Sequence, residues 1–362
     1  MGEQGVKTLM IAGGGTGGHI YPAIAIAREA IARDANRRVV FVGTEYGLEK
    51  TIVPKAGFPL EFIQVGGLKG KGGLDLIRNL ARLPLGFIQA FRLIGKHKPD
   101  VVLGVGGYSS GPVLIAAVLR RVPTIIHEAN AFPGLANRGV SRFVTAVAVA
   151  FADALPRLGR SKDGVVTGNP IRAEFFNHQP PAANGRPRLL IFGGSQGSRV
   201  INNAILAALP LLEPTFEIVH QTGPTDHEKV AAAYRETKFA NARVVPYLDP
   251  MVDELAAADL VVCRAGAMTL GELAAVGKAA ILIPFAAATN NHQEVNARVV
   301  EQAGGAIVLT EKELTAERLA SAIGEVFGDP QRAARMSAAA KALALPDATK
   351  KIVDLIVEIE RN

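Results

Sequence analysis

The sequence predicts an α/β protein made of two doubly wound domains, each built around a parallel sheet. Short runs rich in β-branched residues alternate with helical stretches along the chain. The runs are nearly all apolar, which is typical of strands buried on both faces of a parallel sheet. The succession of strand, glycine-rich turn and helix occurs at residues 9–19 and again at residues 189–199. Two such units in 362 residues indicate two domains in tandem, with ligands in a cleft between them.

The predicted strands divide evenly between the two halves of the chain. Those of the first half are residues 8–12, 38–42, 61–65, 100–104, 124–127 and 146–150. Those of the second half are residues 188–192, 216–220, 243–246, 260–263, 280–283 and 306–309. Residues 173–187 interrupt the pattern with prolines and polar side chains, so we expect a linker there.

The domain boundaries follow from these strands. We expect a first domain at residues 1–172, a second domain at residues 188–345 and a final helix at residues 346–362. This helix would begin at Asp347, and its apolar side chains fall on one face: Ile352, Leu355, Ile356 and Ile359.

Composition excludes several classes of protein. Apolar residues make up 49% and charged residues 20% of the chain, a balance that supports a sizeable core and excludes a disordered protein. Cys263 is the only cysteine, so an intramolecular disulfide and a CxxC site are excluded. Glycines and a proline break the longest apolar region, residues 101–119, so we expect a strand, a turn and a helix there rather than a membrane span.

Positive charge is concentrated in the first half of the chain. Residues 1–170 carry 21 Lys and Arg against 11 Asp and Glu, a net charge of +10, whereas the remainder carries 19 against 22, a net charge of −3. A basic surface of this kind is typical of proteins that bind nucleic acid, anionic lipid or an anionic substrate.

Two glycine-rich turns are candidates for binding a diphosphate. Residues 13–18 (GGGTGG) and residues 193–197 (GGSQG) each lie between a strand and a helix. Glycine lets backbone N–H groups approach phosphate oxygens, a helix start favours an anion, and Ser195 could add a hydroxyl hydrogen bond. One such turn could be no more than a tight connection, but two of them favour diphosphate binding. NAD is disfavoured because the second strand does not end in an acidic residue; Glu45 lies just beyond its end.

A third turn, residues 263–272 (CRAGAMTLGE), also follows a strand and opens a helix. Its N–H groups could hold a phosphate in the same way. Glu272 lies about one turn inside the helix, where its carboxylate could accept two hydrogen bonds from a ribose diol. A surface glutamate near a helix start is the alternative, and by itself it would be the better explanation.

His19 and Glu128 are the candidate general bases. His19 follows the first glycine-rich turn at a helix start, where the helix dipole disfavours the imidazolium and leaves a neutral ring that can accept a proton. Glu128 ends a strand at the ligand-facing edge of its sheet. Asn130 and residues 290–293 (NNHQ) carry amides suited to sugar hydroxyls. A structural histidine and a solvated polar loop are the alternatives.

Several catalytic signatures are missing from the sequence. It has no paired carboxylates at metal-ligand spacing and no DxD cluster in a plausible loop, so we expect neither a metal nor another cofactor. The charge of a nucleotide-diphosphate leaving group would then be stabilised by N–H groups, helix ends and hydroxyls. The absence of GxSxG and GxxxxGK[ST] argues against hydrolase and kinase chemistry.

Residues 68–98 combine positive charge with large apolar side chains. Against one acid, Asp75, stand seven cations: Lys69, Lys71, Arg78, Arg82, Arg92, Lys96 and Lys98. Pro84 is predicted to separate two helices. We expect a few of the apolar side chains to enter a lipid interface while the cations meet anionic headgroups; the alternative is a sheet-covering helix with a solvated basic face. Nucleic acid is disfavoured because the segment has no Tyr or Trp to stack on bases.

Seven motifs follow one another along the chain: GGGTGGHIYP, GVGGYSSGP, HEANAFPGLANR, TGNPIR, FGGSQGSR, CRAGAMTLGE and NNHQEVNA. Together they resemble the MurG family, bacterial N-acetylglucosaminyltransferases of glycosyltransferase family 28, from about Lys7 to the C-terminal tail. The resemblance implies a GT-B fold, in which two Rossmann-like domains face a cleft and the last helix returns to the N-terminal domain. It also implies inverting, metal-independent transfer of N-acetylglucosamine (GlcNAc) from UDP-GlcNAc to lipid I, the undecaprenyl-diphosphate-linked MurNAc-pentapeptide, which yields lipid II for peptidoglycan.

The resemblance implies a donor site by motif match. Ser195 and the backbone around residues 267–269 would hold phosphates, Glu272 would hold the ribose, and the backbone of Leu248 would contact uracil. The full set of donor-binding residues is Asn130, Arg172, Ser195, Leu248, Ala267, Met268, Thr269, Leu270, Gly271, Glu272 and Gln293.

The resemblance places the acceptor on the N-terminal domain. Thr16, Gly17 and Gly18 would face the acceptor diphosphate, and His19 would deprotonate the muramoyl 4-hydroxyl, with Glu128 as the fallback base. A membrane patch on the same domain would hold the protein at the cytoplasmic face of the bacterial cell membrane, where other cell-wall synthesis and division proteins are potential partners.

Two departures from the family pattern concern the sugar contacts. Gln293 and Asn130 would contact GlcNAc, and Arg172 would lie in the donor site. Many relatives have Gln where this chain has Ala129, and an acid is common where it has residues 290–291 (NN). The contact from the first position is lost, and the role of the second is open.

Two other functions compete with this interpretation. A nucleotide-sugar epimerase shares the two-domain architecture but needs acid–base groups on both faces of the donor sugar. A non-catalytic scaffold protein of the cell-wall machinery is expected to lack His19 and the donor motifs, and both are present.

Overall fold

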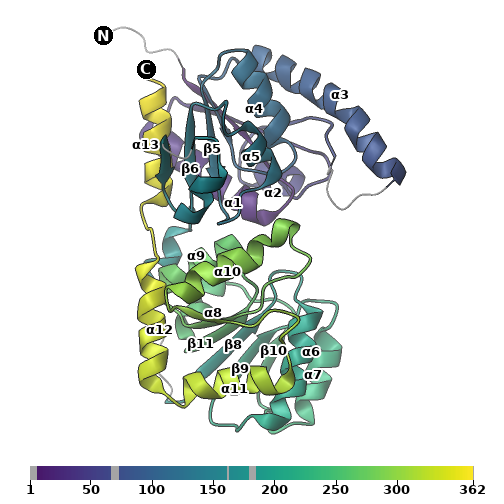
Figure 1. The fold of residues 1–362 in the computed structure, drawn as a ribbon, viewed down its shortest axis with the longest axis vertical. Helices are drawn as coiled ribbons and strands as arrows, with labels where there is room; N and C mark the ends of the chain where they lie inside the picture. Colours follow the sequence, from purple (N-terminus) through teal and green to yellow (C-terminus); the bar gives the residue numbers. More distant parts are fainter. Residues whose placement is uncertain (1–5, 67–72, 161–162, 179–184, 362) are drawn as a thin grey trace. The chain divides into compact units, whose positions relative to one another are not determined.

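The structure, a computed structural model, describes residues 6–66, 73–160, 163–178 and 185–361, and only the backbone of residues 73–82 and Thr289. Its contacts divide the chain into unit 1, Met1–Ile171 with Leu345–Asn362, and unit 2, Arg172–Ala344 (Figure 1). Arg172 thus falls in unit 2. Each unit is an α/β domain with one parallel sheet, which confirms the predicted fold class.

The sheet of unit 1 has the strand order β3-β2-β1-β4-β5-β6-β7. Its strands are β1 Thr8–Ala12, β2 Arg38–Gly43, β3 Leu60–Phe62, β4 Val101–Gly104, β5 Thr124–Glu128, β6 Ala146–Val149 and β7 Gly164–Val166. The six predicted strands are confirmed. The sequence patterns did not predict β7, because its three residues, Gly-Val-Val, are too short an apolar run to stand out.

Helices cover both faces of this sheet. They are α1 Gly17–Arg33, α2 Glu49–Lys55, α3 Gly73–His97, α4 Ser110–Leu119, α5 Leu135–Val140, the 3-10 helix η1 Ala152–Arg157 and, from the end of the chain, α13 Ala348–Ile359. Side chains alternate along β1, so Leu9 and Ile11 pack with α1 and α13. Met10 and Ala12 pack on the other face with α3 and α4.

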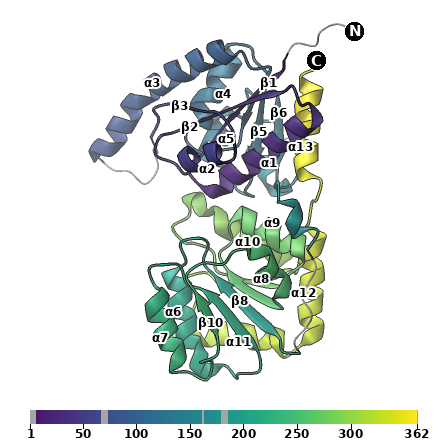
Figure 2. The same ribbon diagram turned by 180° about the vertical axis from the view of Figure 1, so that it is seen from behind.

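The helix α13 confirms that the end of the chain returns to unit 1. It lies beside α1 (Figure 2) and buries Ile352, Val353 and Ile356 completely. Its far end is held by a bidentate ion pair, in which Arg37 Nη1 and Nη2 lie 2.5 and 2.7 Å from the Glu360 carboxylate oxygens.

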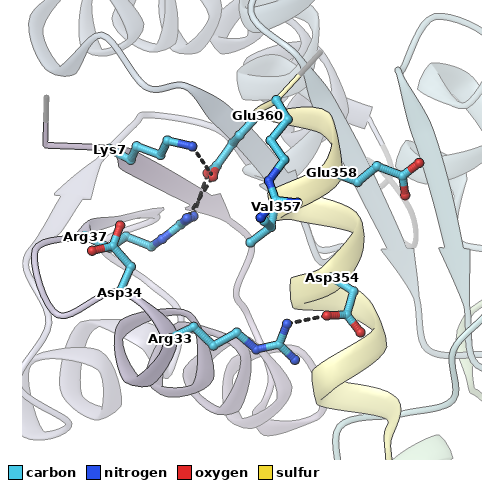
Figure 3. A pocket seen from close by; sticks show the side chains of 9 residues that line it. Lys7, Arg33, Asp34, Arg37, Asp354, Val357, Glu358 and Glu360 are labelled. Atoms are coloured by element: carbon cyan, nitrogen blue, oxygen red, sulfur yellow. Dashed lines mark hydrogen bonds and ion pairs between the residues drawn. The ribbon is translucent and has the colours of Figure 1, made fainter. Parts of the chain in front are cut away.

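A polar cavity of about 850 Å³ lies beside this ion pair (Figure 3). Its lining residues come from α13 and from the chain around α1 and β2: Lys7, Arg33, Asp34, Arg37, Asp354, Val357, Glu358, Glu360 and Arg361. None of these is a predicted site residue. The charges balance, and side chains already pair across the space, as Lys7 does with Glu360 and Arg33 with Asp354.

The prediction that Pro84 separates two helices is wrong. The helix α3 continues through Pro84 from Gly73 to His97. The proline ring is exposed, whereas Ala90 and Ile94 in the second half of the helix are buried against the sheet. One lost hydrogen bond is therefore outweighed by packing. Among the described residues, no helix combines the length and hydropathy that a membrane span requires.

The sheet of unit 2 has the strand order β10-β9-β8-β11-β12-β13. Its strands are β8 Arg188–Phe192, β9 Glu217–Gln221, β10 Arg243–Val245, β11 Leu260–Cys263, β12 Ala280–Leu282 and β13 Ala306–Val308. All six were predicted. Its helices are α6 Arg199–Ala208, α7 His227–Arg235, α8 Met251–Ala257, α9 Ala267–Val276, α10 His292–Gln302, α11 Ala316–Phe327 and α12 Pro330–Ala342, with the 3-10 helices η3 Ala173–Phe175, η4 Leu209–Leu211 and η5 Thr289–Asn291.

Both sheets reverse their strand order at one point. The central strand β1 lies between β2 and β4, and β8 lies between β9 and β11. In open α/β sheets, ligands bind outside the carboxyl ends of the strands at such a reversal. The two glycine-rich turns follow β1 and β8, so each lies at the switch point of its own unit.

Candidate functional site

The first glycine-rich turn of unit 1 packs directly on the turn after β4. A Cβ atom on Gly107 would lie only 2.5 Å from the carbonyl oxygen of Gly14, so no larger residue fits. The buried Ser110 hydroxyl ties the same two segments together. It accepts the Gly106 N–H at 3.0 Å and donates to the carbonyl oxygen of Ala12 at 2.6 Å. The two turns therefore form one cradle at the switch point.

The start of α1 offers free backbone amides to this cradle. Thr16 is the N-cap residue in an extended conformation, and its side chain makes no capping hydrogen bond. The first amides of a helix have no partner inside it, so those of Gly17 and Gly18 are available to an anion. Thr16 and Gly18 are exposed. The three residues expected to face a diphosphate thus lie together at the N-terminus of a 17-residue helix.

His19 is the third residue of α1 and lies beside the same cradle. A Cβ atom on Gly106 would lie 2.9 Å from its ring atom Cε1. The ring also lies near His127, because a charge on His19 contributes to lowering the pKa of His127; the larger cause is burial. His127 Nε2 lies 3.1 Å from the carbonyl oxygen of Gly168, so this nitrogen carries the proton and donates it. Of these two histidines, His19 is the partly exposed one.

Glu128 uses its carboxylate within its own turn. Oε1 accepts the backbone N–H of Asn130 at 2.9 Å and the Asn130 side-chain amide at 3.2 Å. Oε2 accepts the N–H of Gly134 and the side-chain amide of Asn137, both at 2.9 Å. Because four donors hold a buried carboxylate, this geometry favours a structural role for Glu128 and leaves His19 as the better candidate base.

The second glycine-rich turn, in unit 2, interlocks with the turn after β9. A Cβ atom on Gly197 would lie 1.9 Å from the carbonyl oxygen of Thr222, and one on Gly223 would lie 2.1 Å from that of Gln196. The Gln221 side chain donates to the carbonyl oxygen of Gly194 at 2.9 Å. The sequence patterns did not predict this support at residues 221–223 (QTG). Its only local signal is a polar pair and a glycine at the end of a predicted strand.

Two parts of unit 2 suit phosphates: the Ser195 turn and the start of α9. Ser195 lies at the exposed tip of its turn. Gly266 is the N-cap residue of α9, so residues 267–269 form the first turn of this helix, where the helix dipole favours an anion. Leu270 is buried in the core behind them, and Gly271 is partly buried.

Glu272 and Arg172 lie in one electrostatic neighbourhood. Burial raises the pKa of Glu272 to about 7; Arg172 opposes this shift and the charge on Glu174 adds to it. Arg172 Nη1 lies 2.9 Å from Glu174 Oε1, and the Arg172 guanidinium lies 4.9 Å from the ring centre of Phe175. The helix η3 therefore brings a cation next to the partly buried carboxylate of α9.

The remaining donor candidates of unit 2 are Leu248, which follows β10, and Gln293, at the start of α10. The Leu248 side chain is buried, which anchors the backbone that is expected to contact uracil. Gln293, in the first turn of α10, accepts the N–H of Phe285 at 3.0 Å. Asn290 and Asn291 both have φ of 56°, a left-handed conformation that asparagine tolerates, which gives residues 290–291 a backbone role at the start of α10.

Among the described residues, no group of three or more His, Cys, Asp or Glu side chains could hold a metal ion.

Comparison with known proteins gives two domain matches. The N-terminal domain of glycosyltransferase family 28 matches residues 9–149, and the C-terminal domain of the same family matches residues 188–352. The chain is 47% identical over 356 residues to a Myxococcus xanthus protein, with 97% of this chain and 92% of the relative covered. It is 44% identical to a Pelobacter propionicus protein, with 96% and 98% covered. Both relatives are named UDP-N-acetylglucosamine–N-acetylmuramyl-(pentapeptide) pyrophosphoryl-undecaprenol N-acetylglucosamine transferase.

Solved structures agree with these matches. The crystal structure of Acinetobacter baumannii MurG superposes with a TM-score of 0.82 at 30% identity, covering 97% of this chain and 99% of the other. A Neisseria meningitidis UDP-GlcNAc 2-epimerase superposes with a TM-score of 0.68 at 14% identity, covering 98% and 100%, which shows a shared fold alone. With both of its domains matched and close to half of its residues identical to those of full-length relatives, the chain belongs to glycosyltransferase family 28.

Proposed function

We propose that this protein transfers GlcNAc from UDP-GlcNAc to the 4-hydroxyl of the MurNAc residue of lipid I, giving lipid II and UDP with inversion at the anomeric carbon. The observation that carries the proposal is the 47% identity, over 97% of the chain, to a relative named for this transfer. The site geometry supports it, because each unit presents a glycine-rich turn at the switch point of its sheet.

Unit 2 binds the donor. The amides of residues 267–269 and the Ser195 hydroxyl meet the diphosphate, Glu272 accepts hydrogen bonds from the ribose diol, and the backbone of Leu248 contacts uracil. Gln293 and the guanidinium of Arg172 complete this part of the site. Support comes from the exposed position of Ser195, from the place of residues 267–269 in the first turn of α9, and from the proximity of Arg172 to Glu272.

Unit 1 binds the acceptor. The amides of Gly17 and Gly18, with the Thr16 hydroxyl, hold the lipid-linked diphosphate at the start of α1, and Asn130 contacts the incoming sugar. His19 takes the proton of the muramoyl 4-hydroxyl as its oxygen attacks the anomeric carbon. The bond to UDP breaks, UDP leaves with the electron pair, and backbone amides stabilise its charge. No metal ion is needed in this scheme.

The helix α3 associates with the membrane in this proposal. Its described half exposes Leu85 (43%) and Ile88 (46%) on the same face as Arg92 and Lys96. Apolar side chains and cations at helical spacing suit a surface with anionic headgroups. The expected contributions of Lys69, Lys71, Arg78 and Arg82 lie outside the described side chains. The protein would act as a peripheral protein at the cytoplasmic face of the bacterial cell membrane.

Product analysis tests the function. Purified protein, UDP-GlcNAc and lipid I are incubated, and UDP and the lipid product are identified by mass spectrometry. We expect UDP release only when lipid I is present, with one GlcNAc added per UDP. Epimerisation or hydrolysis of UDP-GlcNAc without the acceptor, and no lipid II, would refute the proposal.

A further inference from the structure

Glu49 is a buried carboxylate that the mechanism above does not use. It is the first residue of α2, and only 1% of it is exposed. Burying a carboxylate is costly unless hydrogen bonds replace its water. Its position in the fold therefore calls for an explanation from the groups that surround it.

The Glu49 carboxylate joins the first glycine-rich turn to the turn after β2. Oε2 accepts the backbone N–H of Gly15 at 2.7 Å. Oε1 accepts both the backbone N–H and the hydroxyl of Thr44, each at 2.9 Å. Both oxygens therefore accept hydrogen bonds, and the donor to Oε2 belongs to the turn that precedes α1.

Three glycines surround the Glu49 side chain so closely that none of them could carry a side chain of its own. A Cβ atom would lie 2.4 Å from Glu49 Cδ if placed on Gly14, 2.5 Å from Cγ if placed on Gly43, and 1.9 Å from Oε2 if placed on Gly47. Glycines in both turns that the carboxylate joins therefore make room for it.

The hydrogen bond between Gly15 and Glu49 means that the amides of the glycine-rich turn have different roles. The Gly15 N–H points to Glu49 and is not available to a ligand. The amides of Gly17 and Gly18 lie two and three residues further along, at the helix start. Gly15 has φ of 88°, in the left-handed region that glycine adopts readily, so its peptide can turn its N–H toward a hydrogen-bond partner. Glu49 supplies that partner.

We propose that Glu49 is a positioning residue for the acceptor diphosphate: it draws the Gly15 amide inward and thereby fixes the direction of the Gly17 and Gly18 amides. This inference rests on the proposed function of unit 1. Its signature is an effect on the acceptor alone, because the contacts of Glu49 lie within unit 1 and the proposed donor phosphate, ribose and uracil contacts lie in unit 2.

The main test compares Glu49→Gln with Glu45→Gln. Glutamine has nearly the same shape but only one acceptor oxygen, so either Gly15 or Thr44 loses its partner. We expect the KM for lipid I to rise about tenfold, while the KM for UDP-GlcNAc and the affinity for UDP stay within twofold. Glu45 is exposed on the same loop, so its variant should match the wild type.

A second pair of variants covers the case in which Glu49→Gln does not fold. Thr44→Val removes one hydroxyl donor to Glu49 at nearly constant volume, and Thr44→Ser keeps that donor. We expect the KM for lipid I to be about threefold higher in the valine variant than in the wild type, and unchanged in the serine variant.

The outcomes separate this inference from the proposed function. A purely structural role would lower the active fraction, so that kcat falls and both KM values stay unchanged; that result, or a valine variant equal to the serine variant, would overturn the role of Glu49. A wild-type protein that makes no lipid II would instead overturn the proposed function itself.

Discussion

His19, at the start of α1, lies against Gly106. Both carboxylate oxygens of Glu128, by contrast, accept hydrogen bonds from the residues that follow it. If His19 is the base, His19→Ala lowers kcat by about 10²-fold or more, because proton removal from the attacking hydroxyl is lost. The measurement is steady-state transfer to lipid I at saturating donor. Binding of UDP to the variant should be unchanged.

Glu128→Gln serves as the comparison for this prediction. It should lower the melting temperature, since Gln cannot accept four hydrogen bonds, and alter kcat much less than His19→Ala. A nearly normal rate for the His19 variant, together with a collapse for the Glu128 variant at full stability, would transfer the role of base to Glu128.

Glu272, as the proposed ribose ligand, is expected to give donor binding a pH dependence. Its pKa is raised to about 7 by burial, so the carboxyl of the free protein is largely neutral below that pH. A neutral carboxyl accepts hydrogen bonds from a ribose diol less well than a carboxylate. The Kd for UDP should therefore increase as the pH falls from 8 to 6, by up to about tenfold per pH unit below 7.

The control for this prediction is Glu272→Gln, which should bind UDP more weakly and with a flat profile over the same range. Calorimetric titrations at half-unit pH steps provide the measurement. A flat profile in the wild type would show that Glu272 does not titrate in this window or does not contact the nucleotide.

Sequence patterns identify some of the site residues and miss others for a physical reason. His19, Ser195 and Glu272 follow a strand and a glycine-rich turn, so a local pattern points to them. Glu49 acts on Gly15 across 34 residues, and Gln221 acts on Gly194 across 27. Contacts of this kind depend on the order of strands in a sheet, which no local window contains.

At the level of elements, α3 shows how packing overrides a local rule. Pro84 predicted a break, but the burial of Ala90 and Ile94 keeps the helix continuous. The same burial fixes which face is exposed. The sequence alone could not decide which apolar side chains of residues 68–98 are free for a lipid surface, whereas the structure selects Leu85 and Ile88 from its described half.

This exposed face predicts an effect on membrane binding. The double variant Leu85→Glu with Ile88→Glu should weaken binding to vesicles of anionic lipid by about tenfold or more, because apolar burial is lost and negative charge is added. Co-sedimentation measures it, and transfer to a detergent-solubilised acceptor should be retained. The matched control is Leu211→Glu, which is 54% exposed in unit 2. Equal binding of the double variant and the control would contradict a membrane role for α3.

The docking of α13 predicts an effect on stability. Glu360→Gln leaves the buried Arg37 guanidinium without a charged partner and should lower the free energy of unfolding of unit 1 by about 3 kcal/mol. Denaturant melts measure it, with the exposed neighbour Glu358→Gln as control. A loss no larger than that of the control would mean that apolar packing alone holds α13.

At the scale of the whole molecule, the apolar runs of the sequence predicted every described strand except β7, twelve in all. Buried parallel strands are easy to predict because both of their faces are apolar. The strand order of each sheet, and with it the switch point that gathers distant turns, depends on tertiary packing and emerges only from the structure.

In the proposed mechanism, backbone amides at helix starts, with Ser195 and Arg172, neutralise the two diphosphates in place of a bound cation. The decisive measurement is the initial rate of lipid II formation by metal-stripped protein in EDTA, compared with the rate at millimolar Mg²⁺. We expect the two rates to be equal within about twofold. A rate in EDTA that falls to background and returns with added Mg²⁺ would contradict it.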